Sequence, residues 1–290
     1  MHFTKMEGCG NDYVYVDGSK EIIHMDKKPD IVRKLSDRHF GIGSDGVIFI
    51  NKIKDGNADF EMEMWNADGT RSEMCGNGIR CVAKFVYDKG LTDKTSLVIT
   101  SFGKPKYIDL TLNNNKVSMV KVNMGAPILT PSEIPVKLPE ASAMESDNVI
   151  SYPISVLGKE YKTTCVSMGN PHSVVFLDDN IDLSTFELEK IGPEFENHEY
   201  FPNRINAEFV HIDNRQNVHM RVWERGTGET LACGTGCCAT AVACILNGLT
   251  DNKITIHVLG GDIVCEWDRE KNVIFMTGPA TTVFEGDIDI

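Results

Sequence analysis

The sequence predicts an α+β protein of two similar halves, in which mostly antiparallel strands accompany two buried helices. Three observations support this prediction. Short strand-like runs are frequent, and many follow one another directly through turns. Two helical segments each follow a Cys-Gly-x-Gly stretch. A long part of the chain also matches a later part at a nearly constant offset, which indicates an internal duplication.

Ten short runs have the β-branched and aromatic composition of strands. Turn residues such as Asn113–Asn115 and the pair Asp213-Asn214 separate consecutive runs. This arrangement favours antiparallel sheets over a series of βαβ units. The runs are Asp12–Val16, Gly46–Ile50, Phe60–Met64, Leu97–Thr100, Lys116–Val122, Ser173–Phe176, Glu208–Ile212, Val218–Val222, Ile254–Val258 and Val273–Met276.

A helix is predicted after each Cys-Gly-x-Gly stretch. The first helix has an apolar stripe with helical spacing and a glycine, Gly90, in position to end it. The stripe consists of Ile79, Val82, Ala83 and Val86. The second helix, Gly236–Leu246, is apolar on nearly all sides, so it belongs inside the protein, for instance wrapped by a sheet. The Pro-rich span Pro127–Pro153 is expected to be a loop or interdomain region.

The two copies are related by an offset of 158 residues, which takes Cys75 to Cys233. The tetrapeptide Gly-Leu-Thr-Asp occurs in both copies, at Gly90–Asp93 and Gly248–Asp251. Trp65–Gly103 and Trp223–Gly261 share ten identities in 39 ungapped columns, where about two would be expected from average residue usage. The economical interpretation is two homologous halves of one supersecondary plan.

Composition excludes several classes of function. The 290 residues carry a formal net charge of −13, and no stretch supplies the basic patch that a nucleic acid or an anionic membrane would need. No segment approaches 18 consecutive apolar residues, and the N-terminus lacks the apolar core of a secretory signal. We therefore expect a cytoplasmic protein with a small polar substrate and without a nucleic-acid or membrane partner.

The nine cysteines are an odd number, which does not suit a fully paired extracellular disulfide framework. Reduced thiols are expected. Zinc is disfavoured because Cys75-x5-Cys81 and Cys233-x3-Cys237 form no paired CxxC and have no HxxxH partner nearby. We expect no metal.

Cys75 and Cys233 each precede a glycine-rich helix start. There the unpaired backbone N–H groups and the positive end of the helix dipole favour a thiolate over a thiol. The same N–H groups can bind a carboxylate or a phosphate. We call each cysteine with its glycine-rich helix start a corner. One such corner would suggest a nucleophile or a redox thiol. Two homologous corners can place their thiols on opposite sides of one shared cleft.

That arrangement suits inversion of configuration at carbon. A thiolate would remove a proton from one face while the opposing thiol delivers a proton to the other. The helix N-termini would bind the α-carboxylate and stabilise the charge that develops in the transition state. Such chemistry makes a pyridoxal phosphate lysine unnecessary, so no cofactor is expected.

In seven motifs the chain resembles the diaminopimelate epimerase family. The members of this family are cofactor-independent amino-acid isomerases of lysine and peptidoglycan precursor synthesis. The motifs occur in family order and span nearly the whole chain. They are Gly10-Asn11-Asp12, Asn66-x-Asp68-Gly69, Glu73-Met-Cys-Gly-Asn-Gly78, Gly169-Asn-Pro-His172, Asn206-Ala-Glu-Phe-Val210, Glu224-Arg-Gly-Thr-Gly-Glu-Thr230 and Ala232-Cys-Gly-Thr-Gly236.

The resemblance implies a role for each matching residue. Cys75 and Cys233 would be the acid/base pair, and His172 and Glu224 would tune their thiols. The backbone N–H groups of Gly76-Asn77 and Gly234-Thr235 would hold the reacting α-carboxylate. The distal carboxylate would be bound by Asn66, Asn206 and Arg225, the distal ammonium by Glu224, and Asn11 and Asn170 would complete the polar lining.

The resemblance also implies an architecture: two pseudo-symmetric domains, each a mostly antiparallel sheet rolled around a central helix, with the site in the cleft between them. Residues 1–120 with 279–290 would form the N-terminal half, which carries Cys75, and residues 121–278 the C-terminal half, which carries Cys233. The last strand, Val283–Ile290, would return to the first half. A homodimer is implied as well.

The family includes members with a substrate-contacting glutamine in the early loop, where this chain has Gly46. Two alternatives to diaminopimelate epimerisation remain open from the sequence. One is another cofactor-independent racemase on this scaffold, acting on histidine or proline, and the other is a thiol-redox protein.

Overall fold

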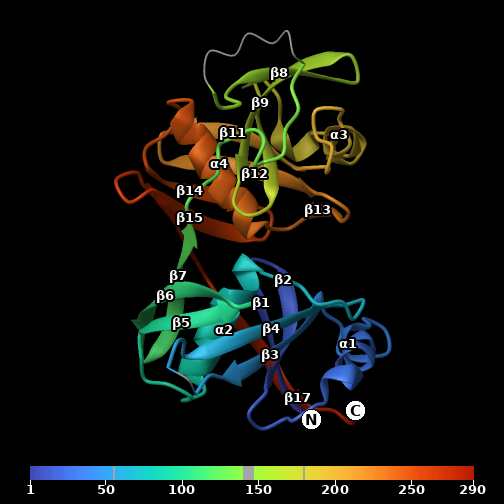
Figure 1. The fold of residues 1–290 in the computed structure, drawn as a ribbon, viewed down its shortest axis with the longest axis vertical. Coiled ribbons are helices and arrows are strands. Elements are labelled where there is room, and N and C mark those ends of the chain that lie inside the picture. Colours follow the sequence, from blue (N-terminus) through green and yellow to red (C-terminus); the bar gives the residue numbers. More distant parts are fainter. Residues whose placement is uncertain (55, 140–146, 179) are drawn as a thin grey trace. The chain divides into compact units, whose positions relative to one another are not determined.

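The computed structural model describes residues 1–54, 56–139, 147–178 and 180–290, and its chain forms two compact units. Unit 1 consists of Met1–Asn123 and Thr277–Ile290, and unit 2 of Met124–Met276. Each unit contains a sheet with one long helix against it and a shorter helix beside it (Figure 1). That these units are the two halves of an epimerase stays a prediction at this stage.

The sheet of unit 1 pairs its strands in the order β17, β1, β2, β3, β4, β5, β6, β7. The strands are β1 (His2–Gly8), β2 (Asn11–Asp17), β3 (Gly46–Lys52), β4 (Phe60–Asn66), β5 (Ser96–Ser101), β6 (Lys104–Asn113), β7 (Lys116–Gly125) and β17 (Thr281–Asp287). Four consecutive residues of β2 and the first five of β3 are buried, as expected of strands covered on both faces.

Two helices cover this sheet. Helix α2 (Gly76–Asp88) packs against β1, β2, β5 and β6, strands spread along the sheet, and most of its residues are buried. Helix α1 (Lys28–Ser36), which follows the 3-10 turn η1 (Met25–Lys27), packs on β3 and β4. Val32 and Leu35 of α1 share a core cluster with Val14, Val47 and Phe49. The sheet therefore encloses α2 on one face and carries α1 on the other.

Unit 2 repeats the plan. Its sheet pairs β8, β9, β10, β11, β12, β14 and β15 in that order, with β13 also on β12. The elements are β8 (Tyr152–Val156), β9 (Lys159–Ser167), β10 (Pro171–Phe176), η2 (Leu183–Thr185), α3 (Leu188–Glu196), β11 (Asn206–Asn214), β12 (Asn217–Glu224), β13 (Gly228–Thr230), α4 (Gly234–Leu246), β14 (Lys253–Val258), β15 (Gly261–Asp268) and β16 (Val273–Gly278).

Helix α4 is the counterpart of α2 and is buried along nearly its whole length. It packs against β9, β10, β11, β14 and β15, while the shorter α3 packs against β8, β11, β12 and β13. The prediction of two buried helices, one in each half, is thus confirmed. Gly90 and Gly248, which follow α2 and α4, have φ values of +70° and +69°, as a helix-ending glycine requires.

The α+β class and the dominance of antiparallel pairs are confirmed, but parallel strands joined through a helix also occur. In the part of the chain that the structure describes, four pairs are parallel: β2–β3, β4–β5, β10–β11 and β12–β14. One helix lies in each of the four connections, because parallel neighbours need a long crossover. The order of pairings is the same in both units, so the duplication seen in the sequence is also a duplication of topology.

The last strand pairs with β1 from His2 opposite Asp287 to Glu7 opposite Thr281, with a shift of register between Lys5 and Met6. The predicted return of the C-terminus to the first half is confirmed, although the strand begins at Thr281 rather than Val283. Helices α1 and α3 were not predicted. In the span Pro127–Pro153, residues 140–146 lie outside the described residues, and β8 begins at its end.

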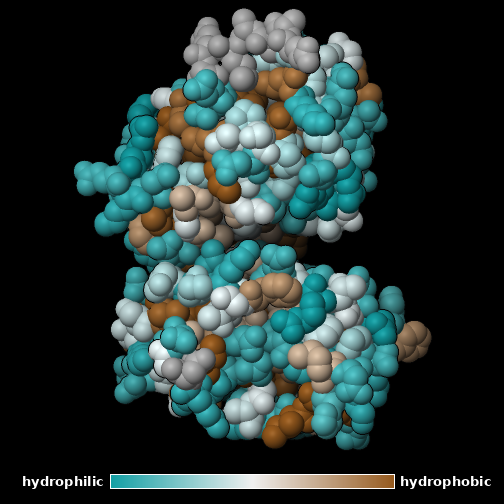
Figure 2. Space-filling view, in the orientation of Figure 1, coloured by the Kyte–Doolittle hydropathy of each residue, from teal (hydrophilic) through white to brown (hydrophobic). Residues whose placement is uncertain are grey.

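Hydrophilic side chains cover most of the face of each unit seen in Figure 2, in keeping with the net charge of −13. Among the described residues, no helix is long and apolar enough to cross a bilayer. No group of three or more His, Cys, Asp or Glu side chains in this same part of the chain could hold a metal ion.

Candidate active site

Cys75 is the N-cap residue of α2. Its backbone is extended, with φ −133° and ψ 118°, and its Sγ accepts a hydrogen bond of 3.2 Å from the N–H of Gly78. A Cβ at Gly78 would lie 2.9 Å from Ile48 Cδ1 on β3, so a larger residue here would require the Ile48 side chain to shift. The cysteine therefore stands where the positive end of a buried helix meets the sulfur.

Asn11 is the second hydrogen-bond partner of the Cys75 sulfur. The Cys75 Sγ donates to Asn11 Oδ1 at 3.0 Å, and Asn11 Nδ2 donates to Asp45 Oδ2 at 2.6 Å. Because a carboxylate only accepts hydrogen bonds, Asp45 sets the orientation of the amide and turns its oxygen to the thiol. Arg38 binds Asp45 at 2.9 Å and holds this carboxylate in turn.

Asn66 ends β4 opposite Gly46, the first residue of β3. Its side-chain Nδ2 donates to Thr70 Oγ1 at 3.1 Å, and its backbone carbonyl accepts from Gly69. The predicted binding residues Gly76 and Asn77 form the first turn of α2, both buried. In unit 1 the structure therefore joins Asn11 to Cys75 directly and places Asn66 at the end of β4.

Cys233 is the N-cap residue of α4, with φ −114° and ψ 110°. Its Sγ accepts from the N–H of Gly236 at 3.4 Å and lies 3.5 Å from Thr235 Oγ1. Burial, followed by the negative charges of Glu224 and Glu208, raises the pKa of the Cys233 thiol well above its ordinary value. In this state Cys233 is a thiol, which is the form that can deliver a proton.

Asn206, Glu224 and Arg225 lie at the ends of β11 and β12. Asn206 is buried, and its Oδ1 accepts from the backbone N–H of Arg225 at 3.0 Å while its Nδ2 donates to the Pro171 carbonyl at 2.9 Å. Glu224 Oε1 accepts from Thr230 Oγ1 at 2.5 Å. The Asn206 side chain is thus occupied in holding the Arg225 backbone in place.

His172 forms a buried pair with Glu208. The His172 Nδ1 lies 2.6 Å from Glu208 Oε1, both side chains are fully buried, and His172 Nε2 lies 3.1 Å from Asn170 Oδ1. The other oxygen of Glu208 has no hydrogen-bond partner within the described ranges. Two of the predicted residues, Asn170 and His172, are therefore brought together by direct contact, and Glu208 holds the imidazole from the other side.

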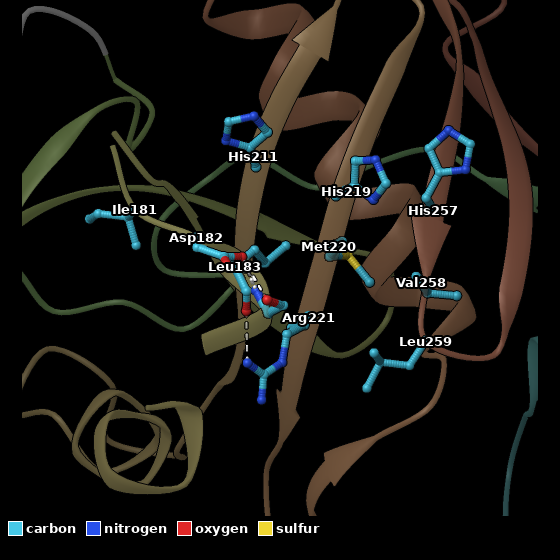
Figure 3. A pocket seen from close by; sticks show the side chains of 11 residues that line it. Ile181, Asp182, Leu183, His211, His219, Met220, Arg221, His257, Val258 and Leu259 are labelled. Carbon is cyan, nitrogen blue, oxygen red and sulfur yellow. Dashed lines mark hydrogen bonds between the residues drawn. The ribbon is translucent and has the colours of Figure 1, made fainter. Parts of the chain in front are cut away.

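A separate pocket of about 390 Å³ lies on unit 2 (Figure 3). Three histidines from adjacent strands, at paired positions of β11, β12 and β14, contribute to its wall: His211, His219 and His257. The rings of His219 and His257 stack with centroids 4.8 Å apart. The lining includes no cysteine and none of the predicted site residues, so it lacks the acid/base pair that stereoinversion needs.

Comparison with known proteins identifies the family. The model for "Diaminopimelate epimerase" matches residues 3–130 and 164–283. A protein of Agathobacter rectalis named diaminopimelate epimerase is 57% identical over 100% of both chains. Namesakes from Acetivibrio thermocellus and Methanococcus maripaludis are 50% and 51% identical, covering 100% of this chain and at least 99% of theirs.

The chain belongs to the diaminopimelate epimerase family. It is therefore an isomerase. The resemblance inferred from the motifs is confirmed, and a thiol-redox protein is no longer a competing interpretation. Solved structures with lower identity share the fold of this epimerase. A PhzF-family phenazine biosynthesis protein of Bacillus anthracis has a TM-score of 0.68 at 16% identity, covering 100% of this chain and 99% of its own. A hydroxyproline epimerase of Agrobacterium vitis has a TM-score of 0.67 at 12% identity, covering 99% and 90%.

In this epimerase Gly46 leaves no room for a side chain. A Cβ at Gly46 would lie 2.0 Å from the carbonyl oxygen of Trp65 on β4, closer than any real contact. A glutamine could stand here only if β3 and β4 moved apart.

Sequence reasoning missed three residues that support the predicted site of the epimerase: Asp45, Glu208 and Thr230. Glu208 offered a signal, since it is a lone carboxylate inside the apolar run Ala207–Val210, and a buried charge requires a partner. Asp45 and Thr230 lie in loop or short-strand stretches rich in polar residues, where sequence does not distinguish a supporting contact from solvent exposure.

Proposed function

We propose that the protein interconverts LL- and meso-2,6-diaminopimelate by a two-base mechanism without a cofactor, in lysine and peptidoglycan precursor synthesis. The observation that carries the proposal is the pair of N-cap cysteines. Cys75 and Cys233 occupy equivalent corners of two repeated units, and each sulfur accepts an N–H from the first turn of a buried helix. Full-length relatives of high identity named diaminopimelate epimerase support the choice of substrate.

In the proposed reaction, one cysteine as thiolate removes the proton from the α-carbon. The C–H electron pair moves toward the α-carboxylate, and the other cysteine as thiol gives its proton to the opposite face of the same carbon. The backbone N–H groups of Gly76-Asn77 and Gly234-Thr235 stabilise the charge that grows on the carboxylate oxygens. The reverse reaction exchanges the roles of the two sulfurs.

The neighbours of Cys233 support its role as the initial proton donor, because the nearby carboxylates favour its protonated form. Asn11 holds the Cys75 sulfur in place through a contact of 3.0 Å. We assign to His172, held between Glu208 and Asn170, the task of tuning a thiol from a buried and fixed position. Glu224 is the second tuning group, because its charge acts on Cys233.

The distal end of diaminopimelate is a second amino-acid group, so its recognition needs both charges. We assign its carboxylate to Asn66, Asn206 and Arg225 and its ammonium to Glu224. The fixed backbone of Arg225 and the hydroxyl of Thr230 on Glu224 support this assignment, because preordered partners reduce the cost of binding. Asn11 and Asn170 complete the polar lining. A substrate without the distal group would leave these polar groups unpaired and would be rejected.

The test is incubation with LL-diaminopimelate in deuterated water. We expect meso-diaminopimelate to form together with deuterium at the inverted α-carbon, because the proton delivered comes from a thiol that exchanges with solvent. Epimer formation without deuterium, or turnover of proline or histidine in place of diaminopimelate, would contradict the proposal. Chiral chromatography with mass detection separates these outcomes.

We also propose that the protein is a cytoplasmic homodimer, as the family resemblance implies. Light scattering after size-exclusion chromatography should give twice the mass of one chain. A single-chain mass over the micromolar range would overturn the dimer.

A further inference from the structure

Arg80 is an arginine with no exposed surface, on the first turns of α2. It is the largest fully buried side chain among the described residues. Burying a guanidinium is costly unless its donors are well placed. Since the mechanism above does not use Arg80, its position needs a different reason.

The guanidinium reaches back to the start of its own helix. Arg80 Nη1 donates to the side-chain Oδ1 of Asn77 at 2.9 Å and to the backbone carbonyl of Gly76 at 3.3 Å. These are the two residues whose N–H groups are assigned to the reacting carboxylate. The planar donor group of Arg80 therefore fixes the turn that carries those N–H groups.

The rest of the guanidinium is anchored to other parts of unit 1. Arg80 Nε donates to the Pro279 carbonyl at 3.0 Å, and Nη2 donates to Cys9 Sγ at 3.6 Å. Glycines make room for it, because a Cβ at Gly278 would lie 3.0 Å from the guanidinium and a Cβ at Gly8 would lie 3.2 Å from Nη2. Arg80 thus ties the first turn of α2 to the loop after β1 and to the returning C-terminal segment.

The duplicated half lacks this device. The offset of 158 places Cys238 opposite Arg80 and Thr235 opposite Asn77. Cys238 is a buried small side chain, and the Thr235 hydroxyl contacts the Cys233 sulfur. The fold itself does not require an arginine at this helix position, so Arg80 is specific to the Cys75 corner.

We propose that Arg80 is a positioning residue, which holds the first turn of α2 so that the N–H groups of Gly76 and Asn77 face the substrate carboxylate and the sulfur of Cys75 keeps its place at the helix start. The carboxylate part of this inference rests on the proposed function. The placement of Cys75 does not, because it concerns the thiol alone.

Two variants test the proposal. Arg80→Lys keeps the charge and loses the planar set of donors, and Gly278→Ala crowds the guanidinium without removing it. The matched control is Gly286→Ala on β17, where a Cβ would approach the Phe3 ring to the same 3.0 Å. Three quantities are measured for each: kcat and KM with LL-diaminopimelate, the rate of Cys75 alkylation by iodoacetamide at pH 8, and the melting temperature.

We expect Arg80→Lys to lower kcat by about tenfold to a hundredfold, since misdirected N–H donors stabilise the transition state poorly. Cys75 alkylation should slow by roughly threefold or more, because the helix N-terminus supports less thiolate. Gly278→Ala should change both quantities in the same direction by a smaller factor, and Gly286→Ala should leave kcat and alkylation within about twofold of the parent protein.

The proposal is overturned if Arg80→Lys and Gly278→Ala lower only the melting temperature and match Gly286→Ala in kcat and alkylation. Should Arg80→Lys fail to fold, Gly278→Ala decides between the two outcomes. If the parent protein does not epimerise diaminopimelate, the proposed function fails, and the alkylation rates still decide whether Arg80 positions Cys75.

Discussion

Replacing Glu208 with glutamine should change thiol reactivity and catalysis in opposite directions. The buried carboxylate of Glu208 binds His172 at 2.6 Å and contributes to the raised pKa of the Cys233 thiol. Glutamine keeps the size and removes the charge. Cys233 should therefore ionise more easily, while His172 keeps a neutral acceptor in place of a charged one.

The size of the change in Cys233 acidity depends on the distance between the Glu208 carboxylate and the Cys233 sulfur, and Gly236 sets an upper limit on that distance. A Cβ at this position would lie 2.7 Å from Glu208 Oε1 and 3.3 Å from Cys233 Sγ, so the two charged atoms are at most about 6 Å apart. At an effective dielectric constant of about 20, two unit charges at about 6 Å repel by about 3 kcal/mol. This energy corresponds to about a hundredfold change in thiolate fraction. A positive charge on His172 would offset part of this repulsion. We therefore expect the thiolate fraction of Cys233 to rise by roughly tenfold to a hundredfold in Glu208→Gln.

The assay compares two thiols in one sample. Alkylation of Cys233 by iodoacetamide at pH 7.5 is followed by peptide mass spectrometry, with Cys75 as the internal standard. Glu229→Gln is the control, because Glu229 pairs with Arg221 and is not among the groups that act on Cys233. Epimerisation by Glu208→Gln should fall about tenfold, as expected when the acceptor of a buried hydrogen bond loses its charge. A Cys233 alkylation rate equal to or below that of Glu229→Gln would refute the reasoning.

Four further outcomes are expected. Cys75→Ser and Cys233→Ser should each lose epimerisation by about 10³-fold, measured by chiral chromatography, and a fully active Cys233→Ser enzyme would exclude the two-base route. Mild oxidant should inactivate the enzyme by joining Cys75 to Cys233, and dithiothreitol should restore it; no recovery, or no cross-linked peptide by mass spectrometry, would count against sulfurs acting on one carbon. Asn206→Ala should raise KM about tenfold with a smaller change in kcat, since Arg225 loses its backbone anchor; an unchanged KM would remove Asn206 from substrate binding. Gly46→Ala should cost about 3 kcal/mol in urea unfolding, because its Cβ would meet the Trp65 carbonyl at 2.0 Å; a stability equal to the parent would show that β3 and β4 separate readily.

The sequence predicted those elements for which several local signals mark the same residues. Helix α2 was predictable because an apolar stripe, a cysteine before glycines and Gly90 at the end all mark the same element. The four parallel pairs were not predictable, because parallel register depends on which strands become neighbours after a helix crosses over. Helices α1 and α3 were missed because each spans only nine residues and has no N-cap side-chain hydrogen bond.

For the predicted site, sequence reasoning found the residues with distinctive chemistry and missed those that support them. Cys75 and Cys233 could be predicted because the duplication marks them as equivalent, and their role as the acid/base pair stays a prediction. Arg80 was passed over because an arginine on a helix is ordinarily solvated, and only the structure shows it fully buried. That Asn206 binds the substrate stays a prediction; the structure adds that its side chain also holds the backbone groups of Pro171 and Arg225.

The two corners have the same backbone and different surroundings. Asn11 contacts the Cys75 sulfur, while its counterpart Asn170 contacts His172 instead. A duplication that produced two identical thiols would give equal acidities, yet a two-base reaction requires one sulfur charged and the other neutral at the start of each turnover. Because the carboxylates of Glu208 and Glu224 act on Cys233, the difference between the corners lies in the side chains around the helices rather than in the helices themselves. Changing these neighbours should therefore redistribute the proton between the two sulfurs without altering the fold.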